Sequence, residues 1–264
     1  MKLPIWQVDA FSARRFGGNP AAVVVLEAWL PDATLLAIAA ENNLSETAYI
    51  LGGGGEYQIR WFTPTEEVPL CGHATLASAW VVFHRLEIGK THVVFQSKSG
   101  PLPVARAGER LVLDFPVNTL EPADAAPEGA TLLAALGRAP RELFRGWHWL
   151  ALYDRAADVR ALQPDMAGIV ASGIHGIIVT APGDDCDFVS RFFAPAAGVP
   201  EDPVTGSAHT RLVPFWAARL SKTSMFARQV SARGGELWCD LRSTENRVSI
   251  AGEAALFLEG SIEI

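Results

Sequence analysis

The segment RWFTP at residues 60–64 has a counterpart 131 residues further along the chain (191 − 60), RFFAP at residues 191–195. At the same offset, VP at residues 68–69 matches VP at residues 199–200, after which the second copy carries an insertion, EDP at residues 201–203. In both copies an apolar run and a glycine-containing turn precede the pentapeptide. A match that extends over two strands and their turn predicts a duplicated unit of domain size.

Each copy is expected to form one α+β half, residues 1–116 and 117–264. Strands are expected near residues 23–26, 48–51, 57–62, 92–96 and 111–115, and near residues 176–180, 187–193, 248–250 and 255–258. A helix with an N-cap is expected at residues 34–41, ended by Asn42 and Asn43, because asparagine tolerates the left-handed conformation. The segment 116–129, rich in proline, alanine and acidic residues, is the expected linker.

Two further local features carry structural expectations. Pro214 lies inside the helix expected after Gly206, and proline removes a helical hydrogen bond, so we expect this helix to kink or to end early. The run GGGG at residues 52–55 lies between two expected strands and is interpreted as a hairpin turn. Known nucleotide-binding and hydrolase motifs are absent from the sequence, so this run is not interpreted as a phosphate loop.

Composition limits the class of protein. The chain of 264 residues is 49% hydrophobic and 19% charged, which is typical of a folded protein with a substantial core. Its net charge of −7 makes nucleic acid an improbable partner and leaves a small anionic substrate compatible. The N-terminus lacks the features of a signal peptide, and the apolar residues 21–26 are far too few for a membrane span. Cys71, Cys186 and Cys239 show no zinc spacing, and a reducing cytoplasm is expected.

Both halves open a helix at a glycine, Gly72 in the first and Gly206 in the second. A helix N-terminus presents free N–H groups and partial positive charge, and glycine allows a ligand to approach these groups closely. Two such helix starts are suited to bind a carboxylate or a developing enolate. The alternative interpretation is that each glycine only permits close packing.

Glu46 lies between the expected helix end and an apolar strand. Its apolar surroundings predict partial burial, and burial raises the pKa of a carboxyl group, which suits a general acid/base near neutral pH. A solvated carboxylate is the alternative. Taken separately, His73, Asp202 and Ser207 are also compatible with purely structural roles.

Cys71 stands directly before Gly72, where a helix N-terminus lowers the pKa of a thiol. Because Cys71 and His73 are two residues apart, we expect them not to face each other, which disfavours a nucleophilic Cys–His pair. Symmetric two-thiol racemase chemistry is also disfavoured, since Thr205 and not cysteine precedes Gly206.

Several motifs together resemble the PhzF-like (phenazine biosynthesis) family. They are VDAF at residues 8–11, FGGNPAAV at 16–23, AENNLSETA at 40–48, FTP at 62–64, CGHATLA at 71–77 and EDPVTGSA at 201–208. The resemblance covers nearly the whole chain. It implies the fold of diaminopimelate epimerase, with two pseudosymmetric halves, each a β-barrel-like sheet around a central helix, and a site in the cleft between them. Residues 252–264 are expected to cross back towards the first half. The resemblance further implies a homodimer and no metal or organic cofactor.

The same resemblance implies roles for individual residues. Glu46 is expected to shuttle a proton on a small carboxylated substrate, and a dihydro-hydroxyanthranilate-like compound is one candidate. The expected substrate-binding residues are His73, Asp202, Ser207, Gly72, Gly206 and Asn19. Cys71 departs from the pattern of the phenazine enzymes, so the sequence is more similar to the broad PhzF-like group of unassigned substrate. Two alternatives stay open: an amino or hydroxy acid epimerase or racemase with Cys71 as a second base, and a binding module without catalysis.

Overall fold

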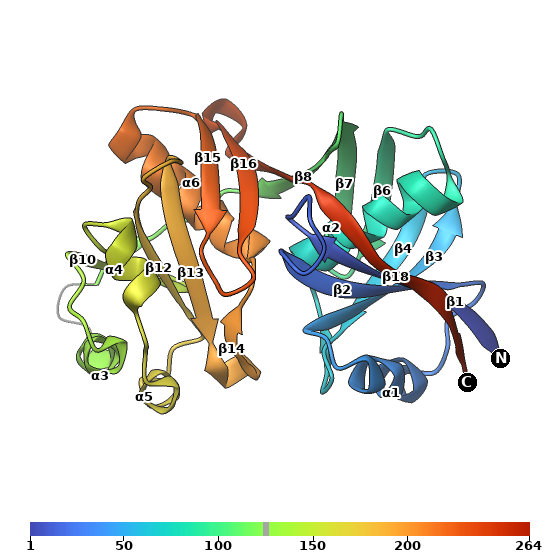
Figure 1. Cartoon of the computed structure of the whole chain (residues 1–264), viewed down its shortest axis with the longest axis horizontal. Coiled ribbons are helices and arrows are strands. Elements are labelled where there is room, and N and C mark those ends of the chain that lie inside the picture. The colour runs from blue at the N-terminus through green and yellow to red at the C-terminus, as the bar shows by residue number, and fades with distance from the viewer. Residues whose placement is uncertain (124–126) are drawn as a thin grey trace. The chain divides into compact units, whose positions relative to one another are not determined.

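A computed structural model describes residues 1–123 and 127–264. The chain divides into two compact units (Figure 1). The first contains Met1–Asp114 and Ser249–Ile264, and the second contains Phe115–Val248. The C-terminal residues therefore belong to the same unit as the N-terminus, because the last strand pairs with the first. Each unit is described separately below.

The first unit is a mixed sheet with two helices. Its elements are β1 (Lys2–Ala10), β2 (Asn19–Leu26), α1 (Asp32–Asn42), β3 (Glu46–Gly53), β4 (Glu56–Phe62), β5 (Glu67–Val68), α2 (Gly72–Val81), β6 (His92–Ser97), β7 (Gly100–Ala107), β8 (Arg110–Pro116) and β18 (Ala254–Glu263). The strands pair in the order β18, β1, β2, β3, β4, β6, β7 and β8, and β5 pairs with β4. The pairs β2–β3 and β4–β6 are parallel. A π-helical turn, Val82–Leu86, extends α2.

The second unit repeats this plan but has four α-helices among its described residues, where the first unit has two. Its elements are β9 (Glu121–Pro122), α3 (Pro127–Leu136), β10 (Glu142–Arg145), β11 (Trp149–Leu152), α4 (Ala156–Ala161), α5 (Met166–Ala171), β12 (Ile177–Pro182), β13 (Phe188–Ala194), β14 (Val199–Asp202), α6 (Gly206–Leu220), β15 (Ser224–Gln229) and β16 (Gly235–Arg242), followed by β17 (Arg247–Gly252). The pairs β11–β12 and β13–β15 are parallel, whereas β12–β13 and β15–β16 are antiparallel. The first unit has the same alternation in β2–β3–β4–β6–β7, which agrees with the duplication seen in the sequence.

The repeated RxF segments form the same ion pair in both units. Arg60 binds both carboxylate oxygens of Glu67 at 2.8 and 2.7 Å, and Arg191 binds those of Glu201 at 2.7 and 2.9 Å. Each guanidinium also lies over the ring of the phenylalanine two residues later, at 5.1 and 4.8 Å. Glu201 therefore takes the place of Glu67, and the extra residues of the second copy precede Glu201. The sequence expectation of an insertion at residues 201–203 was wrong, because ion pairing and not the VP dipeptide sets the register.

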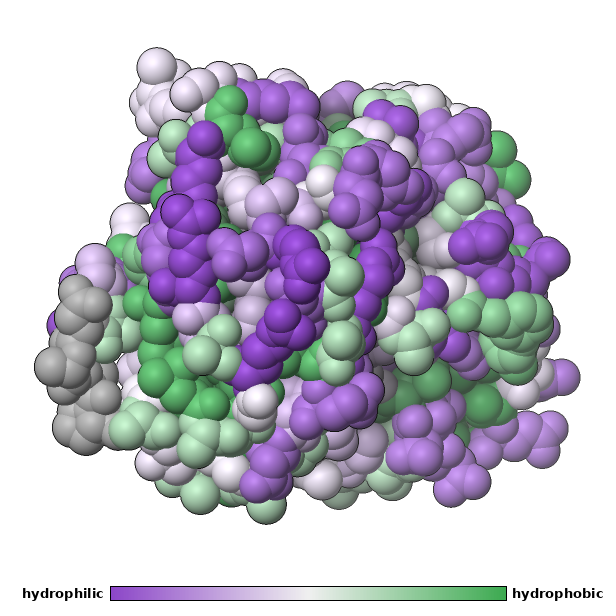
Figure 2. All heavy atoms as spheres, turned by 60° about the vertical axis from the view of Figure 1, so that its left-hand side comes forward, coloured by the Kyte–Doolittle hydropathy of each residue, from purple (hydrophilic) through white to green (hydrophobic). Residues whose placement is uncertain are grey.

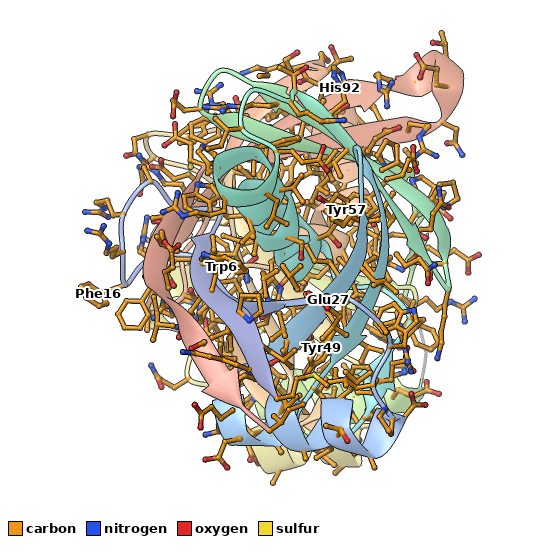
Figure 3. All side chains as sticks on the ribbon, turned by 90° about the vertical axis from the view of Figure 1, so that its right-hand side faces the viewer. Trp6, Phe16, Glu27, Tyr49, Tyr57 and His92 are labelled. Atoms are coloured by element: carbon orange, nitrogen blue, oxygen red, sulfur yellow. The ribbon has the colours of Figure 1, made fainter. Side chains whose placement is uncertain are left out.

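The sheet of the first unit surrounds α2 (Figure 3). The helix packs against β1, β2, β3 and β18, and eight of its residues are buried. Small side chains such as Ala74 and Ala77 let the strands approach it closely. Its buried hydroxyl groups bond to its own carbonyl oxygens: Thr75 Oγ1 donates to Cys71 at 2.6 Å, and Ser78 Oγ donates to Ala74 at 2.8 Å. These bonds satisfy polar groups that would otherwise be costly to bury.

The helix α6 of the second unit continues past Pro214 to Leu220, so the expectation of an early end was wrong. Proline leaves the carbonyl oxygen four residues before it without its helical donor. Here that oxygen belongs to Thr210, and the backbone N–H of Asn118 donates to it at 3.2 Å. A segment outside the helix thus replaces the missing bond.

Three other local expectations can be compared with the structure. Asn43 ends α1 in the left-handed conformation as expected, with φ of 49°, but no side chain caps the start of this helix after Pro31. Gly54 and Gly55 form the expected hairpin turn with positive φ. The expected linker 116–129 contains β9 and the start of α3, while its residues 124–126 lie outside the described part of the chain.

Among the described residues, none of the helices combines the length and apolar character needed to cross a bilayer. On the face drawn in Figure 2, strongly hydrophobic side chains lie in separate patches between hydrophilic ones.

The buried ion pair of the second unit yields a stability prediction. Glu201→Gln leaves the Arg191 guanidinium, whose side chain is only 10% exposed, without its countercharge. We expect the free energy of unfolding to fall by about 3 kcal/mol, measured by denaturant titration. The control Glu121→Gln removes an exposed pair with Arg145 and should change it by less than about 0.5 kcal/mol. Equal effects of the two substitutions would contradict the importance of this ion pair.

Candidate active site

Three elements of the first unit bring the candidate residues together. Asn19 begins β2, and Glu46 begins β3, whose first residue lies beside Ala21 in the parallel pair. Cys71 and His73 lie at the start of α2. The packing of α2 against β2 and β3 therefore gathers side chains that are up to 54 residues apart in the sequence.

His73 occupies the centre of this group. Its Nε2 atom lies 3.3 Å from Oε2 of Glu46. Its Nδ1 atom lies 3.2 Å from Nδ2 of Asn19 and 3.5 Å from Sγ of Cys71. The His73 side chain is 6% exposed and that of Glu46 is 17% exposed, so the expected partial burial of Glu46 is confirmed.

The proximity of Cys71 to His73 corrects the sequence expectation that these residues do not face each other. That expectation assumed helical spacing. Cys71 is instead the N-cap of α2, with an extended backbone (φ −143°, ψ 110°), and this conformation turns its thiol towards the imidazole. Local conformation at the cap, and not the helical period, decides the contact.

Burial determines the charge of His73. Desolvation lowers the pKa of this imidazole from 6.5 to about 3, so it is neutral at physiological pH and carries a single proton. With the amide nitrogen of Asn19 donating to Nδ1, this proton is on Nε2, the ring nitrogen that lies 3.3 Å from Oε2 of Glu46. The Cys71 thiol can also donate to Nδ1. Asn19 and Cys71 thus favour the tautomer that directs the His73 N–H at the Glu46 carboxylate.

Glu46, Cys71 and His73 also form a group of potential metal ligands, with one ligand atom of each within 4.8 Å of the others. Cys71 lies next to Nδ1 and Glu46 next to Nε2 of the ring, and a metal ion would be bound by one of these two nitrogens.

The start of α6 in the second unit carries the remaining predicted residues. Thr205 is the extended N-cap, Gly206 is the first helical residue and Ser207 is partly exposed. The Thr205 hydroxyl donates to the carboxylate of Asp202. These positions match Cys71, Gly72 and His73 of the first unit in their place relative to the helix, but they carry hydroxyl groups and a carboxylate.

Gln229 on β15 contacts this loop, and the sequence analysis did not identify it. It is 1% exposed, and its amide oxygen accepts from the N–H of Thr205 at 2.9 Å. Its amide nitrogen donates to the carbonyl oxygen of Asp202 at 2.7 Å. Gln229 thus holds the loop that carries Asp202. No local signal could have identified it, because it lies 24 residues beyond the segment that it holds.

The two duplicated units and their central helices define a mixed α/β protein of the diaminopimelate epimerase-like class, as expected. A family model for phenazine biosynthesis-like proteins (PhzC-PhzF) matches residues 8–260, and the chain belongs to this family. An uncharacterized isomerase of Pseudomonas aeruginosa is 50% identical over 264 residues, which cover 100% of both chains.

Solved structures agree with this assignment. The crystal structure of a PhzF-family phenazine biosynthesis protein from Enterococcus faecalis is 45% identical, with a TM-score of 0.95 and coverage of 100% of both chains. A hydroxyproline epimerase from Agrobacterium vitis has a TM-score of 0.64 over 99% of this chain and 92% of its own. At 11% identity this second likeness shows a shared fold alone.

The neutral state of His73 can be tested by nuclear magnetic resonance. We expect the ¹⁵N shifts of its ring to indicate a neutral imidazole protonated at Nε2 and to stay constant from pH 8 to pH 5, because its pKa is about 3. The His73→Asn variant assigns the signals. In the unfolded chain this histidine binds a proton near pH 6.5, so its contribution to stability is present above pH 6.5 and is lost as pH falls towards 3. A midpoint between pH 6 and pH 7 in the folded protein would contradict this assignment.

Proposed function

We propose that this protein is an isomerase that moves a carbon-bound proton on a small carboxylated substrate, with Glu46 as its general acid/base. The observation that carries the proposal is the orientation of the Glu46 carboxylate by a buried, neutral imidazole, with Oε2 and Nε2 3.3 Å apart. The proposal assigns no role to a metal or organic cofactor and places the reaction in the cytoplasm.

The proposed reaction conserves all atoms. The Glu46 carboxylate takes a proton from a carbon next to an unsaturated or carboxyl-bearing group, and the electron pair of the broken C–H bond moves into that system. The protonated Glu46 then returns the proton to a different carbon. His73 stabilises the carboxylate form through the partial positive charge of its Nε2–H and takes up the same position after the cycle.

In the proposed mechanism, the two helix starts recognise the negative charge of the substrate. The proposal assigns substrate binding to Gly72 and His73 of the first unit and to Asp202, Gly206 and Ser207 of the second. Free N–H groups at a helix start stabilise a carboxylate and the charge that develops during proton abstraction. Asn19 acts through His73, because it bonds to the ring nitrogen away from Glu46.

The names of relatives favour isomerisation without naming a substrate. The Pseudomonas aeruginosa relative is an uncharacterized isomerase, and the Enterococcus faecalis structure is a phenazine biosynthesis protein. A dihydro-hydroxyanthranilate-like compound is therefore a reasonable first substrate to test. The expected homodimer stays a prediction, and the exposed apolar side chains of β18, among them Phe257 and Leu258 at 43%, are compatible with it.

One observation favours a second candidate function. Cys71 Sγ lies 3.5 Å from His73 Nδ1, so the thiol is next to the imidazole and close to the proposed base. An epimerase or racemase of an amino or hydroxy acid could use Cys71 as a second base. The short distance between Cys71 and His73, which the sequence did not predict, supports this alternative.

The proposed base can be tested by solvent-deuterium exchange. We expect wild type to exchange or rearrange C–H positions of one compound in a panel that contains dihydro-hydroxyanthranilate and small amino and hydroxy acids, followed by NMR in D₂O. Glu46→Gln should lower this rate at least ~10³-fold, because the amide cannot act as a base. Substrate binding should persist.

The matched control is Glu66→Gln, since Glu66 is exposed in the same unit and is not one of the residues that contact His73. It should keep wild-type exchange. Near wild-type turnover by Glu46→Gln would refute its role. Tight binding of a panel compound with no exchange by wild type would favour the binding module instead.

Substitution of Cys71 separates the two candidate reactions. If Glu46 is the acid/base, Cys71→Ala should retain exchange within about tenfold, since the thiol then only helps to orient His73. If Cys71 is a second base, the same variant should lose epimerisation of a chiral substrate, as followed by polarimetry. Inactivation by a thiol reagent that substrate prevents would also favour the epimerase.

A further inference from the structure

Arg211 of α6 is a buried cation for which the described residues offer no anionic partner. It is 7% exposed, and its Nε atom is buried without a hydrogen-bond acceptor. The nearly equally buried Arg191, at 8%, binds Glu201 and several carbonyl oxygens. Burial lowers the pKa of Arg211, with no neighbouring acid to oppose it. An unpaired buried charge is among the costliest features of a fold, so its presence calls for an anion.

The position of Arg211 relates it to the start of the helix. It lies four residues after Ser207, and residues four apart share one face of an α-helix. Side chains of a helix tilt towards its N-terminus, so Arg211 covers the turn that begins near Ser207. Ser207 and Pro214 on this face are only partly buried, whereas most of the other positions of α6 are fully buried. This face is therefore the part of the helix best suited to receive a ligand.

The surroundings of Arg211 are basic and aromatic. His148, between β10 and β11, lies with its ring 4.7 Å from that of Phe192, and its Nδ1 atom is buried without a partner. Burial and the nearby charges of Arg211 and His175 lower the pKa of His148 to about 3. His148 therefore stays neutral, and it can supply one N–H donor without adding charge. Neither Nδ1 of His148 nor Nε of Arg211 has a hydrogen-bond partner among the described residues.

We propose that Arg211 binds the carboxylate of the substrate and that His148 lines the same anion subsite. The planar guanidinium offers two parallel N–H groups that match the two oxygens of a carboxylate, a geometry that an ammonium group does not reproduce. This inference rests on the proposed function, and it deepens that function by naming the group that selects the substrate. The residue is specificity-determining, because it holds a group of the substrate that does not react.

The first experiment measures anion binding without turnover. Benzoate serves as a carboxylate probe, and sodium chloride of equal ionic strength is the reference. We expect benzoate to raise the Tm of the wild type by about 4 °C at concentrations well above its dissociation constant. Arg211→Met should show little benzoate-dependent rise. Without benzoate its Tm should equal or exceed that of wild type, because the unpaired buried charge is gone.

The matched control is Arg219→Met, since Arg219 lies on the same helix but pairs with Glu142 at 2.8 Å. It should keep the benzoate response of the wild type. Equal responses of wild type and Arg211→Met would overturn the subsite. If Arg211→Met fails to fold, Arg211→Lys replaces it, and an unchanged benzoate affinity in that variant would equally overturn the proposal.

Kinetics separate this inference from the proposed function. With the compound whose exchange depends on Glu46, Arg211→Lys should raise KM at least tenfold and change kcat less than about threefold, because the carboxylate is bound alike in the ground and transition states. An unchanged KM would overturn the role of Arg211 and leave Glu46 as the base. Loss of all Glu46-dependent exchange with retained benzoate binding would refute the proposed function and leave the anion subsite standing.

Discussion

Burial of His73 at a helix start is the constraint on which the candidate site depends. The sheet of the first unit closes around α2, so every polar group on this helix needs a partner inside the protein. Thr75 and Ser78 meet this need with backbone carbonyl oxygens of their own helix. His73 cannot do so, and burial instead removes its charge and leaves it to pair with Asn19 and Glu46. The same burial that stabilises the fold thus places a neutral imidazole beside a carboxylate.

Duplication supplied two similar frameworks whose helix starts then diverged. The Arg60–Glu67 and Arg191–Glu201 pairs hold equivalent strands in both units, where the residues serve structure alone. At the helix starts the chemistry differs. The first unit has a thiol, an imidazole and a carboxylate, whereas the second has hydroxyl groups and the Asp202 carboxylate. A structural ion pair has to persist for either sheet to keep its register, but a helix N-terminus can change its side chains without loss of the fold.

The candidate site could be predicted in part. The types and order of Glu46, His73, Asp202 and Ser207 were readable from motifs, and so were the glycines at both helix starts. The contact between Cys71 and His73 was not, because the extended cap conformation breaks the helical spacing on which the expectation depended. Gln229 and Arg211 carry no motif. Gln229 is a buried amide that bonds to a distant loop. Arg211 is recognised only because its described neighbours include no countercharge.

The sequence by itself determined the duplicated plan of the chain, the main strands, the two helix starts and the family. These features depend on local periodicity and on residues close together in the chain, so they leave a pattern that can be read directly. Only the tertiary structure decided the neutral state of His73, the register of the second copy and the continuation of α6 past Pro214. Each of these depends on burial or on a partner from a distant segment, such as Asn118 for the carbonyl oxygen of Thr210, and neither is encoded in local sequence.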